Sequence, residues 1–224
     1  FNTAQREGDN LYSDSVVALD ADTGKLKWHF QFTPNDPYDY DSTQIPVLID
    51  ANWEGAPRKL MLWGNRNGFF YVLDRATGKF LLGKPFTKVN WASGLHPVTG
   101  RPFLTPQGPN QPTFPGPAGA TNWYSPSYSP RTGWFYLSAW ENYSTMFAEG
   151  PRVTYREGQN FTGGNLRQTP GTAAMPLLGR GVINAWHEGA PRGVVMAIDP
   201  MTGQQKWKFE MHDVTTSGIL TTAS

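Results

Sequence analysis

The sequence predicts an all-β fold that forms part of a β-propeller, and three observations lead to this prediction. Glycine and proline account for 24 and 19 of the 224 residues, aromatic residues for 14% and charged residues for only 17%. This composition is typical of turn-rich β proteins and argues against helical bundles and disordered chains. The pattern A-x-D-x-x-T-G-x-x-x-W occurs at residues 18–28 and again at residues 197–207. A weaker copy begins at residue 72, so a repeated β unit is expected.

Each copy of the pattern predicts a β-hairpin. The apolar segments 15–19, 69–73 and 193–198 are expected to be strands that run into an Asp-x-x-Thr-Gly turn. The Asp and Thr side chains can hydrogen-bond the turn backbone, and Gly adopts the positive φ that the turn requires. The strand after the turn carries a large side chain at one fixed position, which is Trp28, Leu82 or Trp207. A further segment, residues 129–136, keeps only the turn and the strand that follows it.

A propeller explains why a large side chain recurs at one position of the repeat. Each blade buries a face against its neighbour, and a Trp can wedge between the two blades. The separation of Asp20 from Asp74 fits one four-stranded blade with a long insertion, and the longer separation of Asp74 from Asp199 leaves room for two blades or more. A β-sandwich with similar turns is the alternative. The long connections 83–125 and 145–190 are expected to be functional loops.

Several classes of function are disfavoured by composition and motifs. The sequence has no Cys, and its four His are far apart, so neither a zinc–cysteine site nor a histidine metal centre is expected. It contains no G-x-S-x-G nucleophile elbow and no G-x-G-x-x-G dinucleotide fingerprint. The net charge of +1 indicates no nucleic-acid partner. No apolar run approaches the roughly 20 residues of a membrane span.

The repeat and four further segments resemble the methanol/ethanol-type quinoprotein alcohol dehydrogenases, which are eight-bladed propellers that use pyrroloquinoline quinone (PQQ). The four segments are residues 8–12, 33–41, 65–74 and 122–130. In that family the A-x-D-x-x-T-G-x-x-x-W repeat is the tryptophan-docking motif. The resemblance covers residues 1–224, which it implies are a partial propeller domain of about four blades. It also implies a fragment whose remaining metal and quinone ligands lie upstream of Phe1.

By this resemblance Asp39 is the catalytic base and a metal ligand. It lies in T-P-N-D-P-Y-D, where the family places its catalytic aspartate. A positioned carboxylate can take the alcohol's hydroxyl proton while hydride leaves the carbon. A nearby cation would keep Asp39 ionised. From composition alone, a turn Asp that caps its own loop is the alternative.

Asp41 is the second expected metal ligand. If the segment 39–41 is extended, both carboxylates point to the same face, which suits a hard, highly charged cation. The family resemblance associates an aspartate two residues after the catalytic one with lanthanide-dependent members, so a lanthanide ion is expected and Ca²⁺ is the alternative. A trivalent ion is the stronger Lewis acid. The alternative is that Asp41 is a solvent-exposed aspartate without a functional role.

Three further residues are expected to bind PQQ. Arg66, in G-N-R-N-G, has a planar donor fork suited to the adjacent quinone oxygens, unless it is a hairpin-turn Arg that faces water. Asn122 and Trp123 match a family pair beside the cofactor, although Trp123 could instead be buried between blades. Ser217 and Gly218 stand where many members have Gly-Gly, which leaves that contact open.

The resemblance therefore predicts an oxidoreductase that converts a small primary alcohol to an aldehyde. PQQ would accept the hydride, a cytochrome c would accept the electrons, and the protein would be periplasmic. A homodimer of the full-length form is compatible with this resemblance. Two alternatives remain: a non-catalytic propeller scaffold with the same repeat, and a fragment that is inactive by itself. A scaffold has no need of the set Asp39, Arg66 and Asn122.

Overall fold

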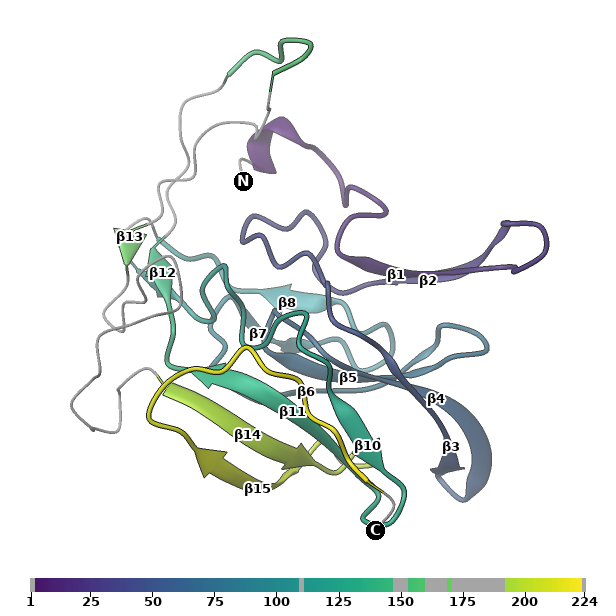
Figure 1. Cartoon of the computed structure of the whole chain (residues 1–224). Helices are drawn as coiled ribbons and strands as arrows, with labels where there is room; N and C mark the ends of the chain where they lie inside the picture. The colour runs from purple at the N-terminus through teal and green to yellow at the C-terminus, as the bar shows by residue number, and fades with distance from the viewer. Residues whose placement is uncertain (1–2, 109–110, 147–152, 160–168, 171–191, 223–224) are drawn as a thin grey trace.

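The computed structural model describes residues 3–108, 111–146, 153–159, 169–170 and 192–222. These residues form fifteen β-strands in five antiparallel sheets and one short 3₁₀ turn, η1 (Thr3–Gln5) (Figure 1). The described residues contain no α-helix and hence no helix that could cross a membrane. The all-β prediction is confirmed.

The central four-stranded sheet is an antiparallel meander in the order β3-β4-β5-β6. Its strands are β3 (Val47–Trp53), β4 (Ala56–Gly64), β5 (Phe69–Asp74) and β6 (Phe80–Pro85). The first five residues of β5 are all buried, because other sheets cover both faces of this one. This double burial is the packing that stacked propeller blades require.

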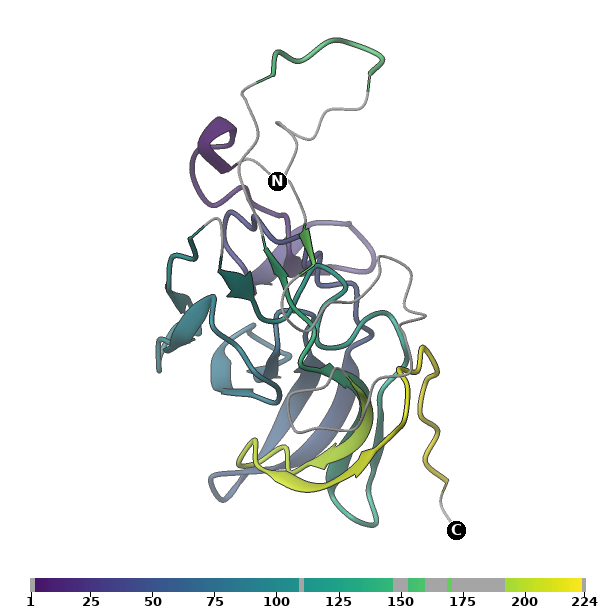
Figure 2. The same cartoon turned by 90° about the vertical axis from the view of Figure 1, so that its left-hand side faces the viewer.

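A second four-stranded sheet packs on one face of the first, as two perpendicular views show (Figures 1 and 2). Its strands are β10 (Ser127–Ser129), β11 (Trp134–Glu141), β14 (Arg192–Ile198) and β15 (Gln205–Glu210). Phe70 of β5 meets Phe135 of β11 with ring centroids 5.1 Å apart. The shared core of these two sheets is formed by aliphatic and aromatic side chains, including Leu60, Leu62, Val72, Leu137, Val194 and Met196.

The hairpin of β1 (Ser15–Leu19) and β2 (Leu26–Gln31) covers the opposite face of the central sheet. Just after β2, Phe32 is fully buried, with its ring 4.9 Å from that of Tyr71 and 5.0 Å from that of Trp63. Adjacent β5 residues therefore serve different cores, since Phe70 faces the second sheet and Tyr71 faces the hairpin. This alternation follows from the two-residue period of a strand.

The number of four-stranded sheets is smaller than the expected four blades. The described residues form two such sheets, together with two two-stranded sheets and one three-stranded sheet, because long connections take up much of the chain. One connection contains β7 (Ala92–Leu95), β8 (Pro102–Leu104) and β9 (Pro112–Thr113), and another separates β11 from β14. Two short strands of this second connection are β12 (Thr145–Met146) and β13 (Thr169–Pro170), and β12 pairs with β9 on one side and with β13 on the other.

The repeated turns have the same hydrogen bonds wherever the pattern occurs. The amide of the turn Gly donates to the first residue's carbonyl in the turns that begin at Asp20, Asp74 and Asp199, each at 2.7–2.8 Å. A turn at His96 was not predicted, yet it has this same bond to Gly100. Its imidazole Nδ1 accepts from the next amides at 3.2 Å, which is the role of Asp Oδ1 elsewhere.

Trp28 packs on the turn glycine of the next sheet, as the wedge interpretation requires. A Cβ added to Gly78 would lie 2.6 Å from Trp28 Cε3. Likewise, a Cβ on Gly203 would lie 2.9 Å from Leu82, the residue that replaces Trp in the weaker copy. The repeat therefore encodes contacts between sheets as well as hairpins within them.

Gly78→Ala should destabilise the fold more than Gly133→Ala. Both glycines have φ near +70°, at 75° and 72°, but only Gly78 is covered by a ring. The backbone strain alone costs about 1–2 kcal/mol, and the added clash with Trp28 brings the expected loss at Gly78 to about 2–4 kcal/mol. Denaturant unfolding of both variants measures the difference, and equal losses would contradict the docking role.

Candidate functional site

Three loops from different parts of the chain meet at one place. The segment 33–43 follows β2, the turn 65–68 joins β4 to β5, and the segment 117–124 precedes β10. Arg66 joins all three, because its guanidinium donates to Asp41 and to the carbonyl oxygen of Pro117. The structure thus brings together Asp39, Asp41 and Arg66, which were predicted from separate motifs.

The loop that carries Asp39 is shaped by a buried carboxylate and a buried ring. Asp36 accepts hydrogen bonds from the amides of Tyr38 and Tyr40 at 2.7 and 2.6 Å. Tyr40 is fully buried, and its hydroxyl donates to the carbonyl of Pro115 at 2.8 Å. The expected extended backbone is wrong: Asp39 and Asp41 have φ of +67° and +50°, because these bonds curl the chain around Asp36. Tyr40 fills the core, while both aspartates interact electrostatically with Arg66.

Asp39 is half-buried, and no hydrogen-bond donor to its carboxylate occurs among the described residues. Burial and the nearby negative charge of Asp41 raise the pKa of Asp39, and the positive charge of Arg66 only partly opposes them. Arg66 alone therefore does not return the pKa of Asp39 to its ordinary value. A cation bound by both carboxylates would lower this pKa.

Arg66 is buried, with only 7% of its surface exposed, so it is not a turn residue that faces water. Its Nη1 donates to Asp41 Oδ2 at 2.8 Å, whereas its buried Nε has no partner. A glycine is required beside it, since a Cβ on Gly119 would lie 2.7 Å from the Arg66 Cβ. The amide of Ala120 also donates to the Arg66 carbonyl at 2.9 Å. These contacts hold the guanidinium in one position.

Asn122 connects the third loop to the Asp39 loop. Its Nδ2 donates to the carbonyl of Ala118 at 2.9 Å, and its Oδ1 accepts from the Thr43 hydroxyl at 3.4 Å. Trp123 is 64% exposed and stacks edge-on with Tyr124, so it is not buried between blades. Its indole is accessible to a ligand.

The stretch that contains Ser217 and Gly218 runs beside the third loop. Ile219 donates its amide to the carbonyl of Ser125 at 2.8 Å, and the Ser217 carbonyl accepts from Ser138 at 2.9 Å. These hydrogen bonds hold the stretch against the segment that follows the third loop, and its contact with a quinone stays a prediction.

A polar network beneath the site was not predicted. It contains Asp14, Thr33, Ser42, Asn65 and Asn67, all buried. Asn67 donates to the Thr33 hydroxyl at 3.2 Å and to the Tyr71 hydroxyl at 2.9 Å. The only sequence signal was the presence of small polar residues within otherwise apolar segments, and this signal does not specify which side chains form hydrogen bonds with each other.

The described residues bring no three His, Asp or Glu side chains together around one point. Asp39 and Asp41 can therefore supply part of a metal's coordination, and other groups must complete it. Carboxylate oxygens are the donors that hard cations such as Ca²⁺ prefer. The unpartnered Arg66 Nε is a donor that fits a quinone oxygen. The residues present thus fit both PQQ and a hard cation.

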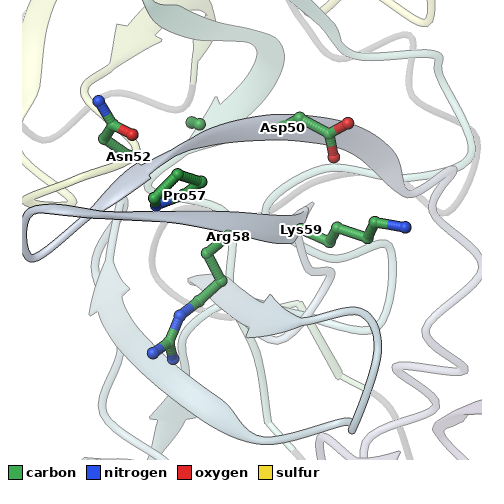
Figure 3. Close-up of a pocket in the computed structure, with 6 residues that line it drawn as sticks. Asp50, Asn52, Pro57, Arg58 and Lys59 are labelled. Carbon is green, nitrogen blue, oxygen red and sulfur yellow. The ribbon is translucent and has the colours of Figure 1, made fainter.

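A pocket of about 530 Å³ lies elsewhere, against the β3–β4 hairpin (Figure 3). Two of its three charged lining residues are paired: Asp50 with Arg75 at 2.8 Å, and Arg58 with Asp74 at 3.9 Å. It contains none of the predicted site residues, and we assign it no function. The lining residues are Asp50, Ala51, Asn52, Pro57, Arg58 and Lys59.

Comparisons with known proteins agree with this geometry. Residues 1–95 match the family described as glucose/ethanol/alcohol dehydrogenase, β-propeller domain. The chain is 40% identical to the 1-butanol dehydrogenase (cytochrome c) of Thauera butanivorans, over 96% of this chain and 30% of that protein. The chain belongs to the quinoprotein alcohol dehydrogenase family.

Solved structures of the family have the same fold over nearly the whole chain. A quinohemoprotein alcohol dehydrogenase from Pseudomonas putida HK5 superimposes with a TM-score of 0.80 at 33% identity, covering 96% of this chain and 32% of that one. A europium-containing methanol dehydrogenase superimposes with a TM-score of 0.78 at 29% identity, covering 95% and 36%. This chain therefore spans about a third of the length of these quinoprotein dehydrogenases. The propeller prediction is confirmed.

Proposed function

We propose that the protein containing this chain is a PQQ-dependent alcohol dehydrogenase that oxidises a primary alcohol to an aldehyde. One observation carries the proposal: a buried arginine, Arg66, joins the loop that carries Asp39 and Asp41 to the loop that carries Asn122. The proposal includes a periplasmic location and a cytochrome c that accepts the electrons one at a time. The name of the Thauera relative, 1-butanol dehydrogenase (cytochrome c), supports the electron acceptor, and the location follows from the resemblance described above.

The residues of this chain would divide the chemistry among them. PQQ, when bound, supplies the acceptor for the hydride that leaves the alcohol carbon. Asp39 takes the hydroxyl proton onto its carboxylate, so that the carbon–oxygen double bond of the aldehyde can form. Arg66 donates hydrogen bonds to cofactor oxygens and stabilises the negative charge that develops there. Asn122 and Trp123 orient the cofactor from the third loop.

We propose a lanthanide ion as the metal, held in part by Asp39 and Asp41, with Ca²⁺ as the alternative. Burial and the nearby carboxylate of Asp41 raise the pKa of Asp39, and a trivalent cation would oppose both effects most strongly. A structural neighbour described as europium-containing supports this choice. The metal would polarise the cofactor carbonyl as a Lewis acid.

A scaffold propeller is the competing proposal, and the burial of the charged group disfavours it. A buried guanidinium costs desolvation free energy, which a carboxylate and one carbonyl only partly return. The docking turns, by contrast, need none of Asp39, Asp41 or Arg66. An assembly scaffold would retain the turns without this costly cluster.

The test is a titration of the full-length protein with PQQ and either La³⁺ or Ca²⁺, followed by alcohol-dependent dye reduction. We expect activity with primary alcohols and a higher kcat with La³⁺. Asp41→Ala should weaken La³⁺ affinity by at least about 10–100-fold, which is the cost of losing even a supporting group of a metal site.

Two outcomes would contradict these assignments separately. If no alcohol reduces the dye with either metal, the enzyme proposal fails. If the wild type responds only to Ca²⁺, and Asp41→Ala keeps that response unchanged, the lanthanide assignment fails while the dehydrogenase proposal stands.

A further inference from the structure

A hydrogen-bonded chain of three buried side chains lies directly beneath the candidate site. The Ser42 hydroxyl donates to Asp14 Oδ1, and the Asn65 amide donates to the Ser42 hydroxyl at 2.8 Å. Asp14 and Ser42 are each 7% exposed, and Asn65 is fully buried. Asp14 is not one of the predicted site residues, and it lies just before β1.

This chain links the neighbours of the two residues that form the site's ion pair. Ser42 follows Asp41, and Asn65 precedes Arg66, whose Nη1 donates to Asp41 Oδ2 at 2.8 Å. The Ser42–Asn65 bond and the Asp41–Arg66 bond thus run in parallel between the same two loops. The first bond is buried, whereas the Asp41 side chain is 51% exposed.

The two sides of this link differ in their intrinsic rigidity. Asn65 sits in a tight turn, where its Oδ1 accepts from the Asn67 amide at 3.0 Å and its carbonyl accepts from Gly68 at 3.0 Å. Asp41 and Ser42 both have φ of +50°, a conformation that non-glycine residues rarely adopt unless their surroundings impose it. The buried Ser42–Asn65 hydrogen bond can impose this conformation on residues 41 and 42, because the Asn65 turn at its other end is held by its own hydrogen bonds.

Asp14 has no cationic partner among the residues that the structure describes. A buried carboxyl without a cation is costly, and burial together with the neighbouring Asp36 raises the pKa of Asp14 to about 7. Its hydrogen bond orients the Ser42 hydroxyl so that the oxygen can accept from Asn65. Asp14 Oδ2 is buried without a partner, so Asp14 Oδ1 makes the hydrogen bond that joins this carboxyl to Ser42.

We infer that Asp14 is a positioning residue that holds Asp41 in place through Ser42 and Asn65. The inference rests on the proposed function, since it takes Asp41 as a ligand of the cation. Asp14 would touch neither the metal nor the cofactor. Its contribution is to keep the carboxylate of Asp41 at a fixed place relative to Arg66 before a cation binds.

The test compares four variants of the full-length protein by titration with Tb³⁺, observed through luminescence sensitised by Trp. Asp14→Ala and Ser42→Ala should weaken Tb³⁺ affinity by about 10–100-fold, the range for supporting groups of metal sites. Asp14→Asn keeps the acceptor oxygen and should stay within about twofold of wild type. Asp199→Ala removes a turn aspartate of the second sheet, and it should leave the affinity unchanged even though it destabilises the fold.

Hydrogen exchange of the segments 36–46 and 62–70 separates a failure of this inference from a failure of the metal assignment. We expect faster exchange in both segments for Asp14→Ala, with rescue by Asp14→Asn. If wild type binds no Tb³⁺ but the exchange result holds, the metal assignment fails and the positioning role stands. Wild-type affinity or unchanged exchange in Asp14→Ala would overturn the inference, as would an equal loss of affinity in Asp14→Asn.

Discussion

Asp39→Asn is expected to lower kcat for alcohol oxidation by about 10²–10⁴-fold, the range for removal of a general base. The amide keeps the size of the carboxylate but cannot accept the hydroxyl proton. The wild-type rate should also fall toward low pH as this carboxyl is protonated, and a bound cation should move that fall to lower pH by opposing the burial and the Asp41 charge that raise the pKa of Asp39. Steady-state kinetics across pH, with saturating PQQ and metal, measure both effects.

The control for this prediction is Asp22→Asn, at an exposed position in the first docking turn. It should leave kcat unchanged, because Asp22 is exposed and its turn is not one of the three loops that form the site. PQQ binding by Asp39→Asn should persist, since Arg66 and Asn122 remain. A variant with wild-type kcat at saturating cofactor would exclude Asp39 as the base.

The part of the fold that could be predicted from the sequence is the part encoded locally. The turns at Asp20, Asp74 and Asp199 each form hydrogen bonds within five consecutive residues, so a short pattern specifies them. The turn at His96 escaped this reasoning because an imidazole nitrogen replaces the carboxylate oxygen as the acceptor. The number of four-stranded sheets could not be predicted from local patterns, because β11 pairs with β14 across a long connection and no local signal reveals that pairing.

The candidate site divides in the same way. Asp39, Asp41 and Arg66 were predicted as site residues, and the structure brings them together. Their roles stay predictions. The extended backbone considered for residues 39–41 does not form. The hydrogen bonds from Tyr38 and Tyr40 to Asp36 determine the backbone there, and the two-residue alternation of a strand takes no account of such bonds. The partnership of Asp14 with Ser42 joins residues far apart in the chain, so only the folded structure could reveal it.

Arg66→Ala is the second large effect that we expect, with kcat/KM lowered by about 10²–10³-fold, as for loss of one preorganised donor. Three groups lose their partner at once: Asp41, the carbonyl of Pro117 and the cofactor oxygens. Arg66→Lys retains the charge but has no planar fork, so one ammonium cannot serve both Asp41 and Pro117. We expect it to be intermediate, and PQQ titration with stopped-flow kinetics measures the series.

A double-mutant cycle with Asp41→Ala separates two roles of Arg66. If Arg66 served only to pair with Asp41, then Arg66→Ala would add nothing to the loss already caused by Asp41→Ala. We expect a further loss of PQQ affinity in the double variant, because the unpartnered Nε is a donor that Asp41 does not use. A double variant that equals Asp41→Ala would assign Arg66 to the ion pair alone. A further loss would indicate that the guanidinium of Arg66 hydrogen-bonds the cofactor, because a buried donor without a partner gains the most free energy when a ligand supplies an acceptor.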